Sequence, residues 1–447
     1  MAMSPLTLRA AFAALAFVLL SILPCPAAEL TFRGNVLQAV AVEPPASTGL
    51  QNVYVLSSLD GVRVSYESPT GSPVSWQRYS SLGGGYAEPV ESTQSGSVST
   101  LSRPEGNMGY IVTDGSTTNC FWIVDYSAYE PVMTSLTLSD QTDCSTTWLD
   151  FSGAGDAITY FGITGQPAEV NREFTLTYQT LEFDEESFSY RQVERTETLA
   201  SLSAHIHCQP AYCQTDFTLS GDRFARIWGR DKEITSPTYE PTAIESQTRA
   251  TQESRSNANE VKDDSPLGGS GPAEITFTAA VTDGALYHEW ELARDPEFNQ
   301  TFLRYSDLEF THTFREQGTT YVRLLTANAS ASCEGESETY TVSIGESMLK
   351  CPNAFSPGAS EGVNDEWKVA YKSIIEFDCH IFDRTGRQLA HLTDPAQGWN
   401  GKIGGKTAPA GVYFYVIRAL GADGKKYKLS GDINIIGYNN PKTNATK

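Results

Sequence analysis

Long apolar runs and positive charge are both scarce in this sequence of 447 residues. Beyond residue 28 no segment approaches the run of about 18 apolar residues that a membrane-spanning helix needs, which predicts a soluble mature chain. Lys and Arg number 32 against 54 Asp and Glu, which gives a formal net charge of −22. This acidity argues against nucleic acids and anionic membrane surfaces as partners, because both repel a negatively charged protein.

Motifs for nucleotide binding and redox chemistry are missing as well. After the N-terminal segment the chain contains no GxxxxGKS/T, GxGxxG or CxxC pattern. One G-x-S-x-G string occurs, at 358–362 around Ser360. A nucleophile elbow places such a serine between a strand and a helix, whereas here Pro352 and Pro357 precede Ser360 and turn-forming residues follow it. The string therefore predicts a loop, and we predict no catalytic residue and no enzyme.

Helical periodicity is a third absence, since no amphipathic stripe of helical length follows the N-terminal segment. Short runs rich in Val, Ile, Thr, Tyr and Phe occur instead, for example at 52–56, 108–112 and 120–124, with turn residues between them. Many short strands at this spacing predict an all-β chain. We expect tandem immunoglobulin-like β-sandwich domains that end in a small β-sandwich.

The N-terminus does carry an apolar run, at 10–23, with Arg9 before it and small residues at 24–28 after it. This arrangement is typical of a secretory signal peptide and is too short for a membrane span. An exported chain meets an oxidising compartment, in which disulfides are favoured.

Changes in composition divide the chain into segments. The stretch 239–271 is polar and nearly free of large apolar residues, which predicts a linker. After it, Trp290 lies in the middle of an expected strand, which resembles an immunoglobulin-like domain of the PKD type. The expected segments are a signal peptide (1–28), two immunoglobulin-like domains (29–128 and 129–238), the linker (239–271), a PKD/immunoglobulin-like domain (272–348) and a C-terminal domain (349–440).

Seven cysteines follow the expected signal peptide, so at least one is unpaired or bonded to another chain. Cys379 lies on an apolar face of an expected strand, which favours it as the free thiol. Cys208 with Cys213, and Cys333 with Cys351, are locally plausible disulfides, but the sequence leaves the pairing open.

Two clusters are candidates for chemistry. His205 and His207 alternate on an expected strand and so project from one face, as two zinc-binding imidazoles would, but no third ligand is suitably spaced. We therefore predict no metal and no cofactor, with these two histidines as weak candidates. The acidic run 182–186 offers paired carboxylates of the kind used in glycoside hydrolysis, although such runs usually form solvated loops.

The C-terminal segment holds the most specific pattern. Its blocks read PNAFSP, GVND, IFDR, GWNGK, PAGVYFYV and GDI, in that order within 351–438. They resemble the gliding-motility-associated C-terminal domain, or type B sorting domain, of Bacteroidetes type IX secretion substrates. The sequence departs from the family at 358–362, where the usual Asn-Gly-Asp-Gly is replaced, and at Thr385 and Asn400. The matching positions are Pro352, Asn353, Phe355, Asn364, Asp365, Phe382, Asp383, Arg384, Gly386, Trp399, Gly401, Gly411, Tyr413 and Tyr415.

The resemblance implies a small sandwich that directs passage through the outer-membrane type IX translocon, usually with a PorP/SprF-like outer-membrane partner. Charge fits a separate docking role for this segment. From Lys350 onward 13 Lys and Arg stand against 9 Asp and Glu, a net of +4, so the rest of the chain carries −26.

These features predict a cell-surface or secreted protein whose immunoglobulin-like domains serve an adhesive, binding or structural role. Its extracellular ligand, a glycan or a protein, is unknown. The alternative is a surface glycan-processing or other hydrolase that uses carboxylates of 29–128 and 129–238.

Overall fold

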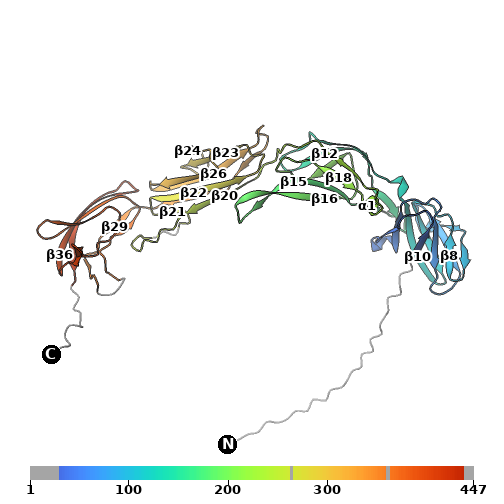
Figure 1. The fold of residues 1–447 in the computed structure, drawn as a ribbon, viewed down its shortest axis with the longest axis horizontal. Coiled ribbons are helices and arrows are strands. Elements are labelled where there is room, and N and C mark those ends of the chain that lie inside the picture. Colours follow the sequence, from blue (N-terminus) through green and yellow to red (C-terminus); the bar gives the residue numbers. More distant parts are fainter. Residues whose placement is uncertain (1–29, 262–264, 359–362, 437–447) are drawn as a thin grey trace, which may run out of the picture.

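β-Strands form nearly all of the regular structure in the computed structural model, which describes residues 30–261, 265–358 and 363–436. The expected all-β class is confirmed. Figure 1 shows the sheets following one another along a long axis, with β10 near one end and β36 at the other. No helix within these ranges is long and apolar enough to cross a membrane. The helical elements are α1 (Arg223–Ile227) and the 3₁₀ turns η1 (Ala46–Thr48), η2 (Gly84–Tyr86) and η3 (Tyr126–Ala128).

The first module is a sandwich of a four-stranded and a six-stranded sheet. The smaller sheet contains, in spatial order, β1 (Leu30–Arg33), β4 (Arg63–Glu67), β8 (Val98–Leu101) and β7 (Thr93–Ser95). The larger contains β2 (Val40–Val42), β3 (Asn52–Leu56), β10 (Thr117–Asp125), β9 (Met108–Asp114), β5 (Val74–Tyr79) and β6 (Glu88–Val90).

The six-stranded sheet is covered on both faces. Residues 120–124 of β10 are all buried, as expected for a strand whose side chains meet apolar neighbours on either side. One face packs on the four-stranded sheet, with Phe121 and Ile123 in that core. The other face, with Trp122, packs against the hairpin of β13 (Ile158–Phe161) and β14 (Pro167–Val170) and against α1. The boundary expected at 128 therefore separates the sheets of the first two modules but not their cores.

The second module is a sandwich of a three-stranded and a four-stranded sheet. The first contains β11 (Val132–Leu138), β12 (Thr147–Ala154) and β17 (His205–Cys208). The second contains β16 (Ser189–Leu199), β15 (Phe174–Asp184), β18 (Thr218–Gly221) and β19 (Lys232–Thr235). In β15 buried and half-buried residues alternate from Phe174 onward, which is the pattern of a strand with one face toward a core.

The third module has the expected tryptophan at its centre, because Trp290 is fully buried in β23. Its smaller sheet contains β20 (Ser246–Gln252), β22 (Ala273–Val281) and β25 (Glu309–Phe314). Its larger sheet contains β21 (Gly268–Gly269), β28 (Tyr340–Ile344), β26 (Gly318–Ala327), β23 (Tyr287–Ala293) and β24 (Thr301–Tyr305), with β27 (Glu334–Glu336) beside β26.

The expectation of a linker at 239–271 is wrong for two parts of that stretch. β20 pairs with β22 along its whole length, and β21 pairs with β28. The low apolar content that suggested a linker has a structural reason. β20 is an edge strand, held by backbone hydrogen bonds and by a few contacts such as Ala250 against the third core.

The C-terminal module contains a five-stranded sheet and two short antiparallel strand pairs. The sheet contains β30 (Ala354–Phe355), β37 (Lys426–Ile435), β36 (Gly411–Gly421), β32 (Ile374–Phe382) and β33 (Gln388–Leu392). The pairs are β29 (Met348–Lys350) with β31 (Ala370–Lys372), and β34 (Lys402–Ile403) with β35 (Lys406–Thr407).

Candidate functional site

Residues of the C-terminal pattern meet in the core of the C-terminal module. Trp399 is buried between Phe355 and Tyr413, with ring centroids 5.6 and 5.3 Å away. The backbones of Trp399 and Trp367 exchange two hydrogen bonds, of 2.9 and 3.0 Å. Tyr415 packs on the Trp367 ring at 5.1 Å. Most of these aromatic residues therefore stabilise the module rather than offer a binding surface.

The first residues of the pattern anchor the entering chain. The Pro352 carbonyl accepts a 2.7 Å hydrogen bond from Trp367 Nε1. The Asn353 carbonyl accepts from the backbone N–H and the side-chain amide of Asn434, at 2.9 and 3.0 Å. These bonds fix the short strand β30 beside β37.

Other residues of the pattern shape turns. The Asp383 carboxylate accepts hydrogen bonds from the Thr385 hydroxyl (2.6 Å) and backbone N–H (2.9 Å), which lower the pKa of Asp383 to about 2. Thr385, a departure from the family pattern, thus closes this turn. Gly386 and Gly401 adopt φ of 84° and 68°, which favour glycine.

The remaining positions lie in loops and at strand ends. The Asn364 carbonyl accepts from the Ser356 N–H at 2.9 Å, and Asp365 Oδ1 accepts from the Gly358 N–H at 2.9 Å. Phe382, Arg384 and Gly411 are half-buried or exposed. Ser360 lies outside the described residues.

One face of the five-stranded sheet is open, and we call it the outer face. It carries the exposed apolar residues Val412, Phe414 and Val416, which alternate along β36. Arg418 continues this row, and Lys428 lies opposite it on β37. Carboxylates lie on this face as well, since Asp378 is opposite Arg418 and Asp432 is opposite Phe414, so the outer face combines an apolar stripe with charges of both signs.

The weak metal candidates of the second module have separate partners. His205 Nδ1 lies 2.8 Å from Asp150 Oδ1, and the His207 ring packs against Trp148 with centroids 5.0 Å apart. A different cluster, Asp378, His380 and His391 on the outer face, has its ligand atoms within 4.8 Å of one another. The sequence did carry a signal for part of it, since Asp378 and His380 alternate on an expected strand.

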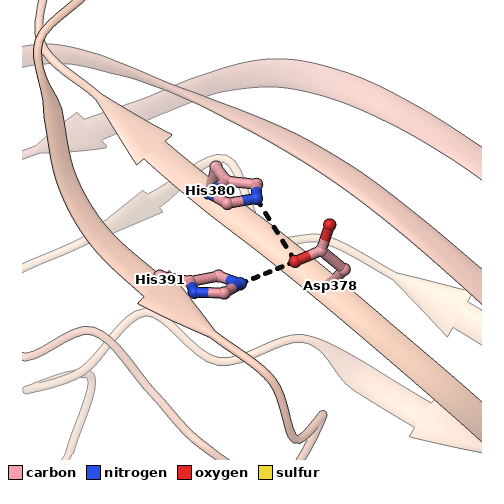
Figure 2. A group of neighbouring side chains, drawn as sticks. All are labelled: Asp378, His380 and His391. Carbon is pink, nitrogen blue, oxygen red and sulfur yellow. Dashed lines mark hydrogen bonds and ion pairs between the residues drawn. The ribbon is translucent and has the colours of Figure 1, made fainter.

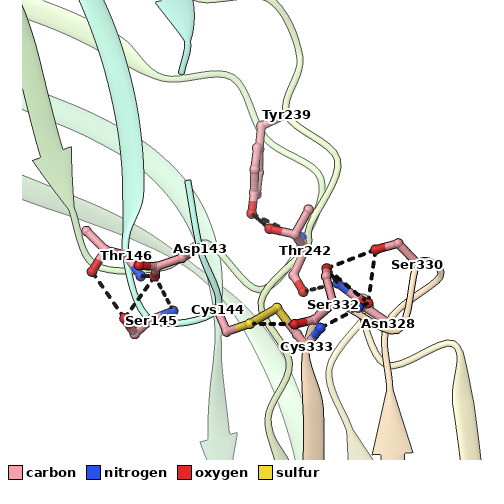
Figure 3. Close-up of a disulfide and its surroundings, with 10 residues drawn as sticks. All are labelled: Asp143, Cys144, Ser145, Thr146, Tyr239, Thr242, Asn328, Ser330, Ser332 and Cys333. Atoms are coloured by element: carbon pink, nitrogen blue, oxygen red, sulfur yellow. Dashed lines mark hydrogen bonds between the residues drawn. A yellow bond between two sulfur atoms is a disulfide. The ribbon is translucent and has the colours of Figure 1, made fainter. Parts of the chain in front are cut away.

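The two proposed disulfides are wrong. Cys333 is bonded to Cys144, at a sequence separation of 189, and Figure 3 shows this bond joining the second and third modules. The loop between β11 and β12 carries Cys144 and reaches the loop before β27, so partners distant in sequence become neighbours. Cys208, Cys213 and Cys351 are free thiols, as is Cys379, the expected unpaired one.

The acidic run 182–186 lies where β15 turns into β16. Glu182 pairs with Arg195 at 2.8 Å and Asp184 with Arg191 at 3.4 Å. These carboxylates have cationic partners on the neighbouring strand, as in a solvated hairpin.

A groove of about 580 Å³ opens on the third module. Exposed Tyr287 and the residues Glu289, Glu334 and Glu336 line it. Glu289 pairs with Arg304 at 3.1 Å and Glu336 with Arg323 at 2.9 Å. An aromatic face beside hydrogen-bonding carboxylates suits a polar ligand with apolar patches.

The fold and the pattern residues define a multi-module β-sandwich chain that ends in a separate, smaller β module. Two segments match family models: residues 137–236 match the fibronectin type III domain, and residues 349–435 match the CHU_C type IX secretion signal domain. The C-terminal module is therefore a type IX secretion signal domain preceded by a fibronectin type III-like domain, which confirms the resemblance found in the sequence. Such a domain supports export to the cell surface or the medium by the type IX secretion machinery.

Solved structures similar to the chain include the tetra-tandem repeat in the extending region of a large adhesion protein. It is 13% identical, covers 85% of this chain and 96% of that one, and has a TM-score of 0.21. The BSP domain of a biofilm associated protein is 10% identical, with coverages of 93% and 97% and a TM-score of 0.17. A comparison with curated proteins gave no match.

Proposed function

We propose that this protein is a non-enzymatic surface or secreted protein whose first three modules bind an extracellular glycan or protein. The observation that carries the proposal is the succession of β-sandwiches along one axis, with a type IX secretion signal domain at the end (Figure 1). An extended series of sandwiches holds a binding surface away from its point of attachment. The disulfide between the second and third modules supports this by fixing two neighbours to each other.

The groove on the third module is the surface that we propose for ligand binding. Tyr287 would stack on a sugar or an apolar side chain, and the three glutamates would accept hydrogen bonds from hydroxyl or amide groups. The test is to incubate the purified protein with a glycan and matrix-protein array and, in parallel, with chromogenic glycosides. We expect binding without turnover, and weaker binding after Tyr287→Ala.

Tyr86→Ala is the matched control for the groove, because Tyr86 is an exposed tyrosine that does not line it. Unchanged binding in Tyr287→Ala would contradict the proposal that the groove binds the ligand. Turnover that a single carboxylate substitution abolishes would instead establish the hydrolase alternative.

We propose further that the C-terminal module directs export and that a PorP/SprF-like outer-membrane protein receives it on the outer face. A chain that ends at residue 348 should accumulate in the periplasm, whereas a chain that ends at residue 436 keeps every described strand and should still reach the surface. If the chain that ends at 348 also reached the surface, the sorting role would be wrong.

The docking surface needs its own test. Phe414→Asp places a charge in the exposed apolar stripe without changing the core, so the module should fold and export should fall. Val132→Asp makes the same kind of change at an exposed site of the second module and should leave export unchanged. Equal export of both variants would exclude the outer face as the docking surface.

A further inference from the structure

Three metal-ligating side chains converge at the edge of the outer face. Asp378 and His380 lie two residues apart on β32, so both project from the same side of the strand. His391 lies on the edge strand β33, directly opposite His380 in the antiparallel register. Figure 2 shows both imidazole rings turned toward one carboxylate oxygen, Asp378 Oδ1.

The His380 ring has an acceptor at each nitrogen. Its Nε2 lies 3.2 Å from Asp378 Oδ1, and its Nδ1 lies 3.1 Å from Gln388 Oε1. A neutral imidazole carries one N–H and can donate to only one of these oxygens. When the proton is on Nδ1, this N–H donates to Gln388 Oε1. The Nε2 lone pair then faces the Asp378 carboxylate, and a cation between Nε2 and the carboxylate would stabilise this arrangement. A hydrogen bond from the second ring nitrogen is also what orients metal-binding histidines in proteins.

His391 supplies the second nitrogen. Its Nε2 lies 2.6 Å from the same Asp378 oxygen, and its ring stacks on that of His380 with centroids 4.3 Å apart and planes 6° from parallel. The two imidazole nitrogens and the carboxylate oxygen therefore lie close enough together for a single cation to contact all three.

The spacing of the donors suits a tetrahedral ion. Ligands held about 2.0–2.2 Å from zinc at tetrahedral angles lie about 3.3–3.6 Å from one another. The separation of 3.2 Å from His380 is close to this value, whereas the separation of 2.6 Å from His391 is about 0.7–1 Å shorter. The three side chains are partly exposed, so they can move apart by the roughly 1 Å that this geometry requires.

We infer that Asp378, His380 and His391 form a binding site for a divalent transition metal ion, with Zn²⁺ as the best fit. Two imidazoles and one carboxylate are ligands that zinc accepts, whereas Ca²⁺ and Mg²⁺ require sets of oxygen ligands. The set leaves a coordination position for water or for a donor from another molecule. Arg418, the register partner of Asp378 on β36, brings a positive charge to this face and lowers the affinity.

Calorimetric titration of the full-length protein with Zn²⁺, after removal of metals with EDTA, tests the site. We expect one equivalent of Zn²⁺ per chain, no competition from Ca²⁺ or Mg²⁺, and visible ligand-field absorption when Co²⁺ replaces Zn²⁺. His391→Asn and Asp378→Asn should each weaken binding at least tenfold. Gln388→Ala should weaken it by about 10–100-fold, because it removes the acceptor that orients His380.

The double variant His205→Gln/His207→Gln is the matched control, since it removes the other exposed strand histidines and leaves the three ligands in place. It should bind Zn²⁺ like the parent protein. Absence of Zn²⁺ binding and of the Co²⁺ spectrum in the parent would overturn the inference, as would binding lost in the control but kept in His391→Asn. Circular dichroism of each variant distinguishes a lost ligand from a lost fold.

Discussion

At the scale of single residues, the buried ion pair of Arg172 and Asp222 lies within the second module and contacts the first module through Tyr126. The two side chains are 1% and 0% exposed, and Arg172 Nε donates to Asp222 Oδ2 at 2.6 Å. The other guanidinium nitrogens donate to the carbonyls of Asp156 and Tyr129, at 2.8 and 2.6 Å. Asp222 Oδ1 also accepts from the Tyr126 hydroxyl at 2.7 Å. A buried charge is tolerated here because each polar group has a partner.

Replacing Arg172 with Ala should therefore destabilise the protein strongly. The change leaves the Asp222 carboxylate buried without its cation, which typically costs about 3–5 kcal/mol of unfolding free energy. Urea unfolding followed by tryptophan fluorescence measures the difference. Arg191→Ala is the control, because Arg191 is 68% exposed in its pair with Asp184 and should cost less than about 0.5 kcal/mol. Similar losses of unfolding free energy in the two variants would show that burial does not determine how much the Arg172–Asp222 pair stabilises the protein.

The buried thiols give a second expectation at this scale. Burial raises the pKa of Cys208 and of Cys379 to about 12, from an ordinary value of 9.0. Because the folded chain disfavours the thiolate, the contribution of these neutral thiols to stability is complete below pH 9 and is lost as the pH rises toward 12.

Alkylation with iodoacetamide at pH 8, followed by peptide mass spectrometry, should leave both thiols unmodified in the native protein. The same reaction in denaturant should modify both, and Cys144 and Cys333 should react only after reduction. Rapid native labelling of Cys379 would contradict its burial.

Sequence patterns predicted some residues of this structure and missed others for a physical reason. Trp290 and Cys379 could be placed on buried strand faces, because strand alternation is a local property. The partners of Arg172 and Cys144 could not, because the paired residues are 50 and 189 positions apart in the sequence, and no local pattern records which loops meet. The metal-ligating cluster was predictable only in part. Asp378 and His380 alternate on one strand, which is a local pattern, but the position of His391 depends on the register between β32 and β33.

At the scale of secondary-structure elements, β20 is a polar strand that the sequence pattern did not predict. Its residues alternate between half-buried and exposed, and Ala250 is one of its few contacts with the third core. The Thr248 hydroxyl lies 2.9 Å from the Tyr340 hydroxyl, which ties the strand to β28. The strands at 52–56 and 120–124 were predictable because their apolar side chains carry the signal, whereas β20 depends on backbone pairing.

A fragment that begins at the boundary expected from composition, 272–347, should be less stable than the fragment 241–347. The shorter one lacks β20 and so leaves the edge of β22 unpaired. Several backbone hydrogen bonds worth about 0.5–1.5 kcal/mol each are lost, so we expect at least about 2 kcal/mol less unfolding free energy and more aggregation.

Chemical denaturation and light scattering measure both effects. The fragment 253–347 keeps β21 but lacks β20, and it should behave like the shorter fragment. If it matched 241–347 instead, β20 would be dispensable.

At the scale of the whole molecule, charge and shape divide the chain in the same place. The segment from Lys350 onward has a net charge of +4, and the rest has −26. The positive segment is the type IX secretion signal domain at one end of an extended series of sandwiches (Figure 1). We therefore expect that export and the proposed extracellular binding can be changed independently, since the residues that we assign to each lie in different modules.

The Cys144–Cys333 disulfide is placed to set the direction of this series, because it fastens the second module to the third (Figure 3). Asn328 assists it: its Nδ2 donates to the Thr242 carbonyl at 2.9 Å, and its Oδ1 accepts from the Ser332 N–H at 3.0 Å. The second and third modules have separate main cores, so breaking the bond should loosen the junction more than it destabilises either of these modules.

The double variant Cys144→Ser/Cys333→Ser should therefore show a broader distribution of end-to-end distances than the parent protein. The unfolding midpoints of the separate modules should be nearly unchanged. Small-angle X-ray scattering, or distances between spin labels on the second and third modules, would record the change. Cys213→Ser removes a free thiol of the second module and should leave the distribution as it is in the parent. A distribution that stayed narrow in the double variant would mean that the hydrogen bonds of Asn328 and the packing at the junction suffice. The non-covalent contacts at the junction of the second and third modules would then maintain the extended form, which would persist in a reducing environment.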